Sequence, residues 1–141
     1  MTDLAPRLGD VWRYPFLWSR EAASGETEGR KERPVVLALL VRNRIDEMVL
    51  LMVPITSVPQ SDRYAIEVPE IEKRRAGLDA HMRLWIVADE ANEANEDIPA
   101  RSFYFESGNR IGQFSAPFTK QVQAVMIEAL KAKRLQRTGR G

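Results

Sequence analysis

Residues 29–41 read GRKERPVVLALLV, so a charged, glycine-containing loop runs directly into seven apolar residues. The apolar run is too short for a membrane-spanning helix, and the β-branched residues at its ends favour a buried strand. Proline is tolerated as the first residue of a strand, where its missing N–H costs no ladder hydrogen bond. We therefore predict a strand over residues 34–41 with Arg33 at the lip of the sheet, where this side chain either binds phosphate or is an ordinary surface arginine.

The size and composition are those of one globular domain, residues 1–141. Hydrophobic residues make up 44% of the chain and charged residues 29%, which excludes an intrinsically disordered protein. There is no cysteine and His81 is the single histidine, so thiolate chemistry and Cys- or His-based metal sites are excluded and no cofactor is expected. Residues 1–20 lack the apolar core of a signal peptide, which favours a cytoplasmic protein without a membrane segment.

Hydrophobic patterning predicts a mainly β chain. Two neighbouring apolar runs, residues 34–41 and 48–55, favour antiparallel strands buried on both faces, as in a closed or heavily covered sheet. Residues 19–33 and 90–99 are polar and are predicted to be loops, the first with a helical turn at residues 19–23. Further strands are predicted at residues 11–18, 64–68, 83–89, 102–105 and 111–114.

Two helices are predicted. Residues 70–76 place acids first and bases last, as the helix dipole prefers, and Gly77 provides a stop. Ser115 is a suitable N-cap for a terminal helix, whose predicted core face consists of Phe118, Val122, Val125 and Met126. The basic tail, residues 134–141, is predicted to be solvated and frayed. The net charge of +1 is not the footprint of a strong nucleic-acid binder.

Four motifs, in this order and spacing, resemble the MazF/PemK family of type II toxin-antitoxin toxins, and in particular its PemK-like growth-inhibitor branch. They are Gly9-Asp10-Val11-Trp12, Arg33-Pro34, Pro54-Ile55-Thr56-Ser57 and Trp85-Ile86-Val87-Ala88-Asp89-Glu90. The resemblance implies an α+β, SH3-like small β-barrel of the MazF/PemK/CcdB type with a C-terminal helix, usually a homodimer. It implies cleavage of single-stranded RNA without a metal, and an antitoxin protein that lies over a groove at Arg33 and Thr56.

In the reaction that the resemblance implies, the ribose 2′-hydroxyl attacks the adjacent phosphorus and leaves a 2′,3′-cyclic phosphate. Arg33 matches the family's phosphate-facing arginine, and because a guanidinium titrates above about 12 it stabilises charge rather than donating a proton. Thr56 matches the family's threonine and would donate a hydrogen bond to the same phosphate, with Ser57 beside it. Strand-end turn chemistry is the alternative for both hydroxyls.

Four further residues are assigned by the same resemblance. Asp89 matches an aspartate that some members use as a base, although a solvated strand-end carboxylate is the more ordinary interpretation. Glu28 stands where other members carry a loop acid, and the neighbouring cations Arg30 and Lys31 are candidates for binding RNA. The catalytic prediction is therefore Arg33, Thr56 and Asp89.

The chain also departs from the family pattern at two positions. Val87 and Asn92 replace arginines that many members carry two residues before and three residues after the aspartate. Each charge-assisted contact to a desolvated phosphate contributes about 1.5 to 3 kcal/mol, so their loss could weaken RNA binding or abolish cleavage. The alternative function is a non-catalytic module on the same barrel that binds nucleic acid or a protein, as gyrase-poisoning CcdB-type barrels do.

Overall fold

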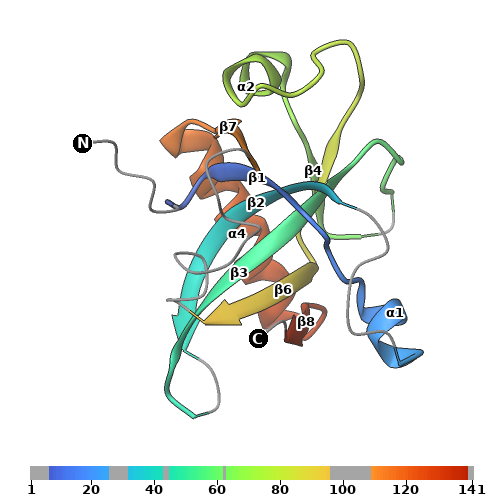
Figure 1. Cartoon of the computed structure of the whole chain (residues 1–141), viewed down its shortest axis with the longest axis vertical. Helices are drawn as coiled ribbons and strands as arrows, with labels where there is room; N and C mark the ends of the chain where they lie inside the picture. Colours follow the sequence, from blue (N-terminus) through green and yellow to red (C-terminus); the bar gives the residue numbers. More distant parts are fainter. Residues whose placement is uncertain (1–6, 26–31, 43–44, 62, 96–108, 140–141) are drawn as a thin grey trace.

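The computed structural model describes residues 7–25, 32–42, 45–61, 63–95 and 109–139. The fold is mainly antiparallel β-sheet with a long C-terminal helix across one face, which confirms the predicted fold class (Figure 1). The strands are β1 (Asp10–Tyr14), β2 (Arg33–Arg42), β3 (Met48–Thr56), β4 (Ala65–Glu67), β5 (Trp85–Val87), β6 (Glu90–Asn95), β7 (Arg110–Gln113) and β8 (Gln136–Gly139). The helices are α1 (Ser19–Ala23), α2 (Glu70–Arg75) and α4 (Ala116–Lys131).

The sheet is organised around the antiparallel pair β2 and β3, the two apolar runs of the sequence. Strand order is β4-β5-β3-β2-β1-β7, and β6 pairs with β3 as well as, in parallel, with β8. Val35 lies opposite Pro54, and the register shifts once between Leu37 and Leu39. The predicted pairing of neighbouring strands is therefore confirmed.

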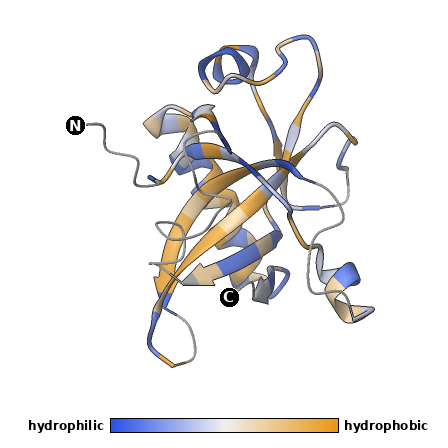
Figure 2. Cartoon of the chain, in the orientation of Figure 1, coloured by the Kyte–Doolittle hydropathy of each residue, from blue (hydrophilic) through white to orange (hydrophobic). Residues whose placement is uncertain are grey.

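Both faces of this strand pair are buried, because successive side chains point to opposite sides of a strand. Val36 and Ala38 join a core beneath α4, whereas Val35 and Leu37 join a second, aromatic cluster on the opposite face. Figure 2 shows the resulting continuous apolar character of β2 and β3. The aromatic cluster is defined by Trp12, Tyr14, Phe16, Trp18, Val35, Leu37, Leu50, Met52, Val87 and Ala94.

The C-terminal helix α4 begins as predicted. The Phe118 N–H donates to Ser115 Oγ at 3.3 Å, and that hydroxyl donates to Glu72 Oε2 at 2.6 Å, which ties α2 to the start of α4. Phe118, Val122 and Met126 are buried, and each contributes about 1.5 to 3 kcal/mol by leaving water. None of the helices among the described residues has the length and apolar character needed to cross a bilayer.

Helix α2 is also confirmed. Gly77, just past its end, has φ +75°, a backbone conformation that glycine adopts without the steric cost of a Cβ.

Three segments differ from the sequence prediction. Strand β1 ends at Tyr14 rather than residue 18, because Pro15 interrupts it and the Phe16 N–H turns back to Tyr14 O at 2.9 Å. Residues 90–95 form β6 instead of a loop, because pairing with the centre of β3 overrides the low strand propensity of Asn and Glu. Residues 136–139, which were predicted to belong to a frayed tail, form β8 and pair with β6. The predicted strand at residues 102–105 lies outside the described residues.

Candidate active site

The structure places two of the predicted catalytic residues at neighbouring ends of the central strands β2 and β3, on one face of the sheet. Continuing the β2–β3 register two residues outward from Val35 and Pro54 brings Arg33 level with Thr56. Since side chains alternate along a strand, both residues belong to the face of the aromatic cluster. Arg33 is flanked by Tyr14 of β1, and Thr56 by Trp85 of β5.

Arg33 is partly buried and forms no ion pair among the described residues. Its guanidinium carbon lies 5.3 Å from the centroid of the Trp18 ring, and its Nε is buried without a hydrogen-bond partner among the described residues. Burial lowers the pKa of Arg33, the nearby Glu21 carboxylate opposes this, and Arg20 lowers it further. The group remains cationic because its ordinary pKa is so high. An arginine that forms no ion pair with another described residue is suited to an oxyanion.

Thr56 combines the two alternatives that the sequence left open. Its Oγ1 accepts a hydrogen bond from the Val58 N–H at 3.1 Å, which is the strand-end turn chemistry. The single hydrogen of the same hydroxyl is engaged by no other described residue and is left to donate. Ser57, next to it, is exposed.

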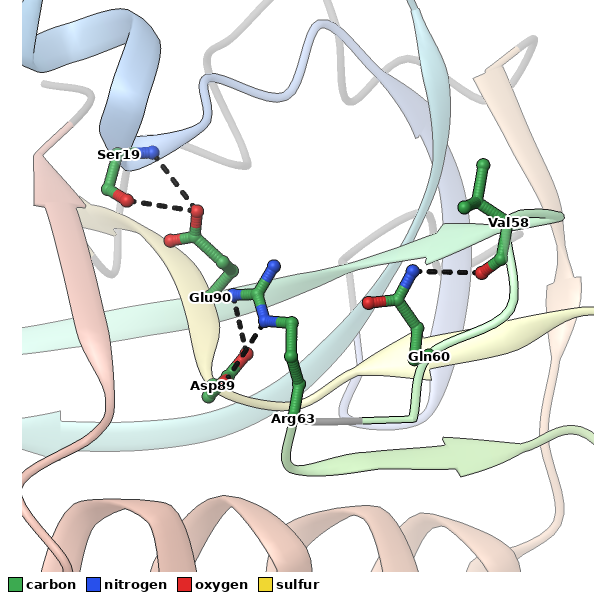
Figure 3. A network of polar contacts seen from close by, with 6 residues as sticks. All are labelled: Ser19, Val58, Gln60, Arg63, Asp89 and Glu90. Atoms are coloured by element: carbon green, nitrogen blue, oxygen red, sulfur yellow. Dashed lines mark hydrogen bonds and ion pairs between the residues drawn. The ribbon is translucent and has the colours of Figure 1, made fainter.

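Asp89 is not the solvated carboxylate of the alternative interpretation. It is buried in the β5–β6 turn, where Arg63, from the segment before β4, contacts it (Figure 3). The Arg63 Nε donates to Asp89 Oδ2 at 3.2 Å. The Arg63 Nη2 lies 2.7 Å from Asp89 Oδ1 but forms no hydrogen bond with it. This pair opens onto a surface hollow of about 470 Å³. The hollow is lined by Arg63, Tyr64, Asp89, Arg134 and Gln136.

Glu90 is a buried carboxyl that the sequence analysis did not single out. Its Oε1 accepts hydrogen bonds from the Ser19 N–H (3.2 Å) and hydroxyl (3.0 Å), which fasten α1 to the start of β6. Its Oε2 is buried and has no hydrogen-bond partner among the described residues. Burial raises the pKa of Glu90, and the two hydrogen bonds from Ser19 oppose that rise. The sequence signal was its place directly after Asp89.

Glu90→Gln is expected to make unfolding less pH-dependent. Because the folded-state pKa is raised, the folded protein keeps a proton that the unfolded chain has lost, so wild-type stability falls as pH rises from the ordinary glutamate range through the folded pKa. Glutamine keeps the acceptor for Ser19 and cannot ionise. In thermal unfolding, the stability of the variant relative to wild type should be higher at about pH 7 than at about pH 4, where the difference should vanish.

Glu128→Gln, on the exposed side of α4, is the control and should leave the pH profile of unfolding unchanged. A Glu90→Gln protein that is less stable than wild type at every pH would show that hydrogen bonding to the carboxylate outweighs its burial.

The comparisons with known proteins give matches among solved structures. No family model matches the chain, and none of the curated proteins matches its sequence. Among solved structures, an endoribonuclease in complex with its cognate antitoxin from mycobacterial species aligns with a TM-score of 0.54 and 15% identity, over 90% of this chain and 96% of that chain. This chain shares that endoribonuclease's fold.

Within this fold, the two departures from the family pattern are buried. Val87 belongs to the aromatic cluster and is fully buried. Asn92 is also fully buried, where its Oδ1 accepts from the Leu17 N–H at 2.9 Å and its Nδ2 donates to Leu17 O at 2.6 Å. Asn92 therefore lies against the segment that follows β1, Val87 lies within the aromatic cluster, and neither side chain reaches solvent.

Other cations occupy the surroundings of the predicted site. Arg63 pairs with Asp89, and Arg20 of α1 lies over the same indole as Arg33. Neither was identified from the sequence. Three predicted substrate-binding residues, Glu28, Arg30 and Lys31, lie outside the described residues. No group of three or more His, Asp or Glu side chains within the described ranges could hold a metal ion.

Proposed function

We propose that this protein is a metal-independent endoribonuclease toxin of a type II toxin-antitoxin system, related to MazF and PemK. The observation that carries the proposal is the position of Arg33, which forms no ion pair among the described residues and lies next to Thr56 when the β2–β3 register is extended. The fold shared with an endoribonuclease that has been solved with its antitoxin supports it.

The proposed reaction assigns a role to each group. Arg33 binds two phosphoryl oxygens and stabilises the extra negative charge of the transition state, and Thr56 donates its hydroxyl hydrogen to the same phosphate. Asp89 removes the 2′-hydroxyl proton, and Arg63 fixes the orientation of its carboxylate. As the 2′-oxygen bonds to phosphorus, the bond from phosphorus to the 5′-oxygen breaks, and the departing 5′-oxygen takes a proton from water. Ser57, Glu28, Arg30 and Lys31 are the proposed RNA-binding residues, although the last three lie outside the described residues.

A non-catalytic binding module on the same fold is the second candidate. It is favoured by one observation: the ion pair with Arg63 occupies the carboxylate of Asp89 and makes it less accessible to a substrate hydroxyl. In that case Arg33 and Thr56 bind the RNA backbone, and no bond is broken.

Three further features follow from the resemblance and remain proposals. They are an antitoxin protein that covers Arg33 and Thr56, an SH3-like barrel that forms homodimers, and a cytoplasmic location. Sedimentation at micromolar concentration tests the dimer, which a purely monomeric protein would exclude.

The proposed function is tested by incubating purified protein with single-stranded RNA in EDTA. We expect cleavage, with upstream fragments ending in a 2′,3′-cyclic phosphate, because attack by the 2′-hydroxyl needs no external nucleophile. Fragments ending in a simple 3′-hydroxyl would refute this mechanism. RNA that binds and stays intact would establish the binding module instead.

A further inference from the structure

Two arginines lie over one indole beside the predicted site. The guanidinium carbon of Arg20 is 5.0 Å from the centroid of the Trp18 ring, and that of Arg33 is 5.3 Å from it. The indole is itself fixed, since it packs edge-on against Phe16 with centroids 5.2 Å apart. Both cations are thus held at a rigid aromatic surface that attracts them through its quadrupole.

These arginines lack an ion-pair partner within the described part of the chain, although the nearby Glu21 carboxylate favours the charged form of Arg33. One oxygen of the nearby Glu21 carboxylate accepts the Trp18 N–H at 3.1 Å. Two like charges around one indole repel each other, so the arrangement gains from an anion that sits between or across them.

The same chain shows what a compensated arginine on tryptophan looks like. Arg83 lies over Trp85 at 4.9 Å, but there the carboxylate of Glu67 accepts two hydrogen bonds from the guanidinium, at 2.8 and 2.9 Å. Arg83 is therefore a structural contact whose charge is balanced by Glu67. Arg20 and Arg33, by contrast, form no ion pair within the described part of the chain.

The position of Arg20 is fixed by contacts of its own helix, α1. The preceding residue, Ser19, donates its N–H and its hydroxyl to the buried Glu90, and α1 also contacts β8 (Figure 1). Trp18 is buried and offers no open face for a nucleobase. What the site presents to solvent is cationic rather than aromatic, so it is suited to a phosphate backbone and not to base stacking.

We propose that Arg20 and Arg33 form a two-arginine clamp, with Trp18 as its support, for the phosphate backbone of single-stranded RNA. Arg20 binds the phosphate next to the one held by Arg33. The clamp takes the place of the arginines that other members carry where this chain has Val87 and Asn92. The identity of the anion as RNA rests on the proposed ribonuclease function, whereas the clamp itself rests on the geometry.

The test measures binding of a single-stranded 2′-O-methyl RNA, which cannot be cleaved by 2′-hydroxyl attack, over a series of salt concentrations. Arg20→Ala should weaken binding about tenfold, the low end for a hydrogen-bonded charge. The slope of log affinity against log salt should fall by about 0.7, the value for one lost phosphate contact on a single strand. Arg20→Lys should restore most of the slope but less of the affinity, because it keeps the charge and loses the fork.

Arg83→Ala is the matched control, since it removes an equal charge from an equal position over a tryptophan. It should leave affinity and slope unchanged. If Arg20→Ala binds RNA as tightly as Arg83→Ala, with the same slope, the clamp is refuted even though RNA cleavage would still support the proposed function. If wild type fails to cleave RNA but binds it in an Arg20-dependent way, the clamp stands and the nuclease proposal falls.

Discussion

Arg33→Ala should lower the rate of RNA cleavage by about a hundred- to a thousandfold, the usual cost of losing one preorganised donor to a charged transition state. The fold should persist, because this side chain makes no ion pair among the described residues and its contact with Trp18 is worth about 0.5 to 1 kcal/mol. Single-turnover cleavage and thermal unfolding, measured on the same preparation, separate the two effects.

Arg42→Ala at the other end of β2 provides the control. This arginine is exposed and paired with Asp46, so its removal changes the net charge equally without touching the site. Thr56→Ala should lose less activity than Arg33→Ala, since a neutral hydroxyl contributes less than a guanidinium. Cleavage by Arg33→Ala at the wild-type rate would remove Arg33 from the mechanism.

Val87→Arg, which restores the family pattern, should unfold the protein rather than activate it. The wild-type side chain is fully buried in the aromatic cluster, and an unpaired charge at such a place costs several kcal/mol. That is a large part of the roughly 5 to 15 kcal/mol by which domains are stable. Circular dichroism and thermal unfolding should show loss of the folded state.

Val58→Arg makes the identical substitution at an exposed position two residues past Thr56, and it should fold normally. A Val87→Arg protein that folds and cleaves RNA faster than wild type would show that the aromatic cluster rearranges readily to admit an arginine. The missing arginine would then be a loss of function and not a consequence of how this face is covered.

The sequence predicted those parts of the site that depend on local pattern. Arg33 and Thr56 could be brought together because two apolar runs joined by a short polar connection form neighbouring antiparallel strands, and Pro34 marks where one begins. The terminal helix followed from Ser115 and its apolar spacing. These features need only short-range information.

The remaining features depend on contacts that no local pattern encodes. Arg63 meets Asp89 across 26 residues, and Ser19 meets Glu90 across 71. Strand β6 was missed because Asn92 resembles a loop residue, whereas its amide is buried against the backbone of Leu17. The sequence showed only that Val87 and Asn92 lack the positive charge of the family's arginines. The structure adds that both side chains are fully buried.

The hydrogen bonds between Asn92 and Leu17 also set an order of assembly. The β2–β3 hairpin closes a short loop, whereas Leu17 and Asn92 are 75 residues apart. Closing the longer loop costs more conformational entropy, so this contact is expected to form more slowly. The segment after β1 can settle only once β6 has docked beside β3, and hydrogen exchange at the Leu17 amide reports that step. We therefore expect a folding chain to align Arg33 with Thr56 early and to bring Arg20 beside them only later.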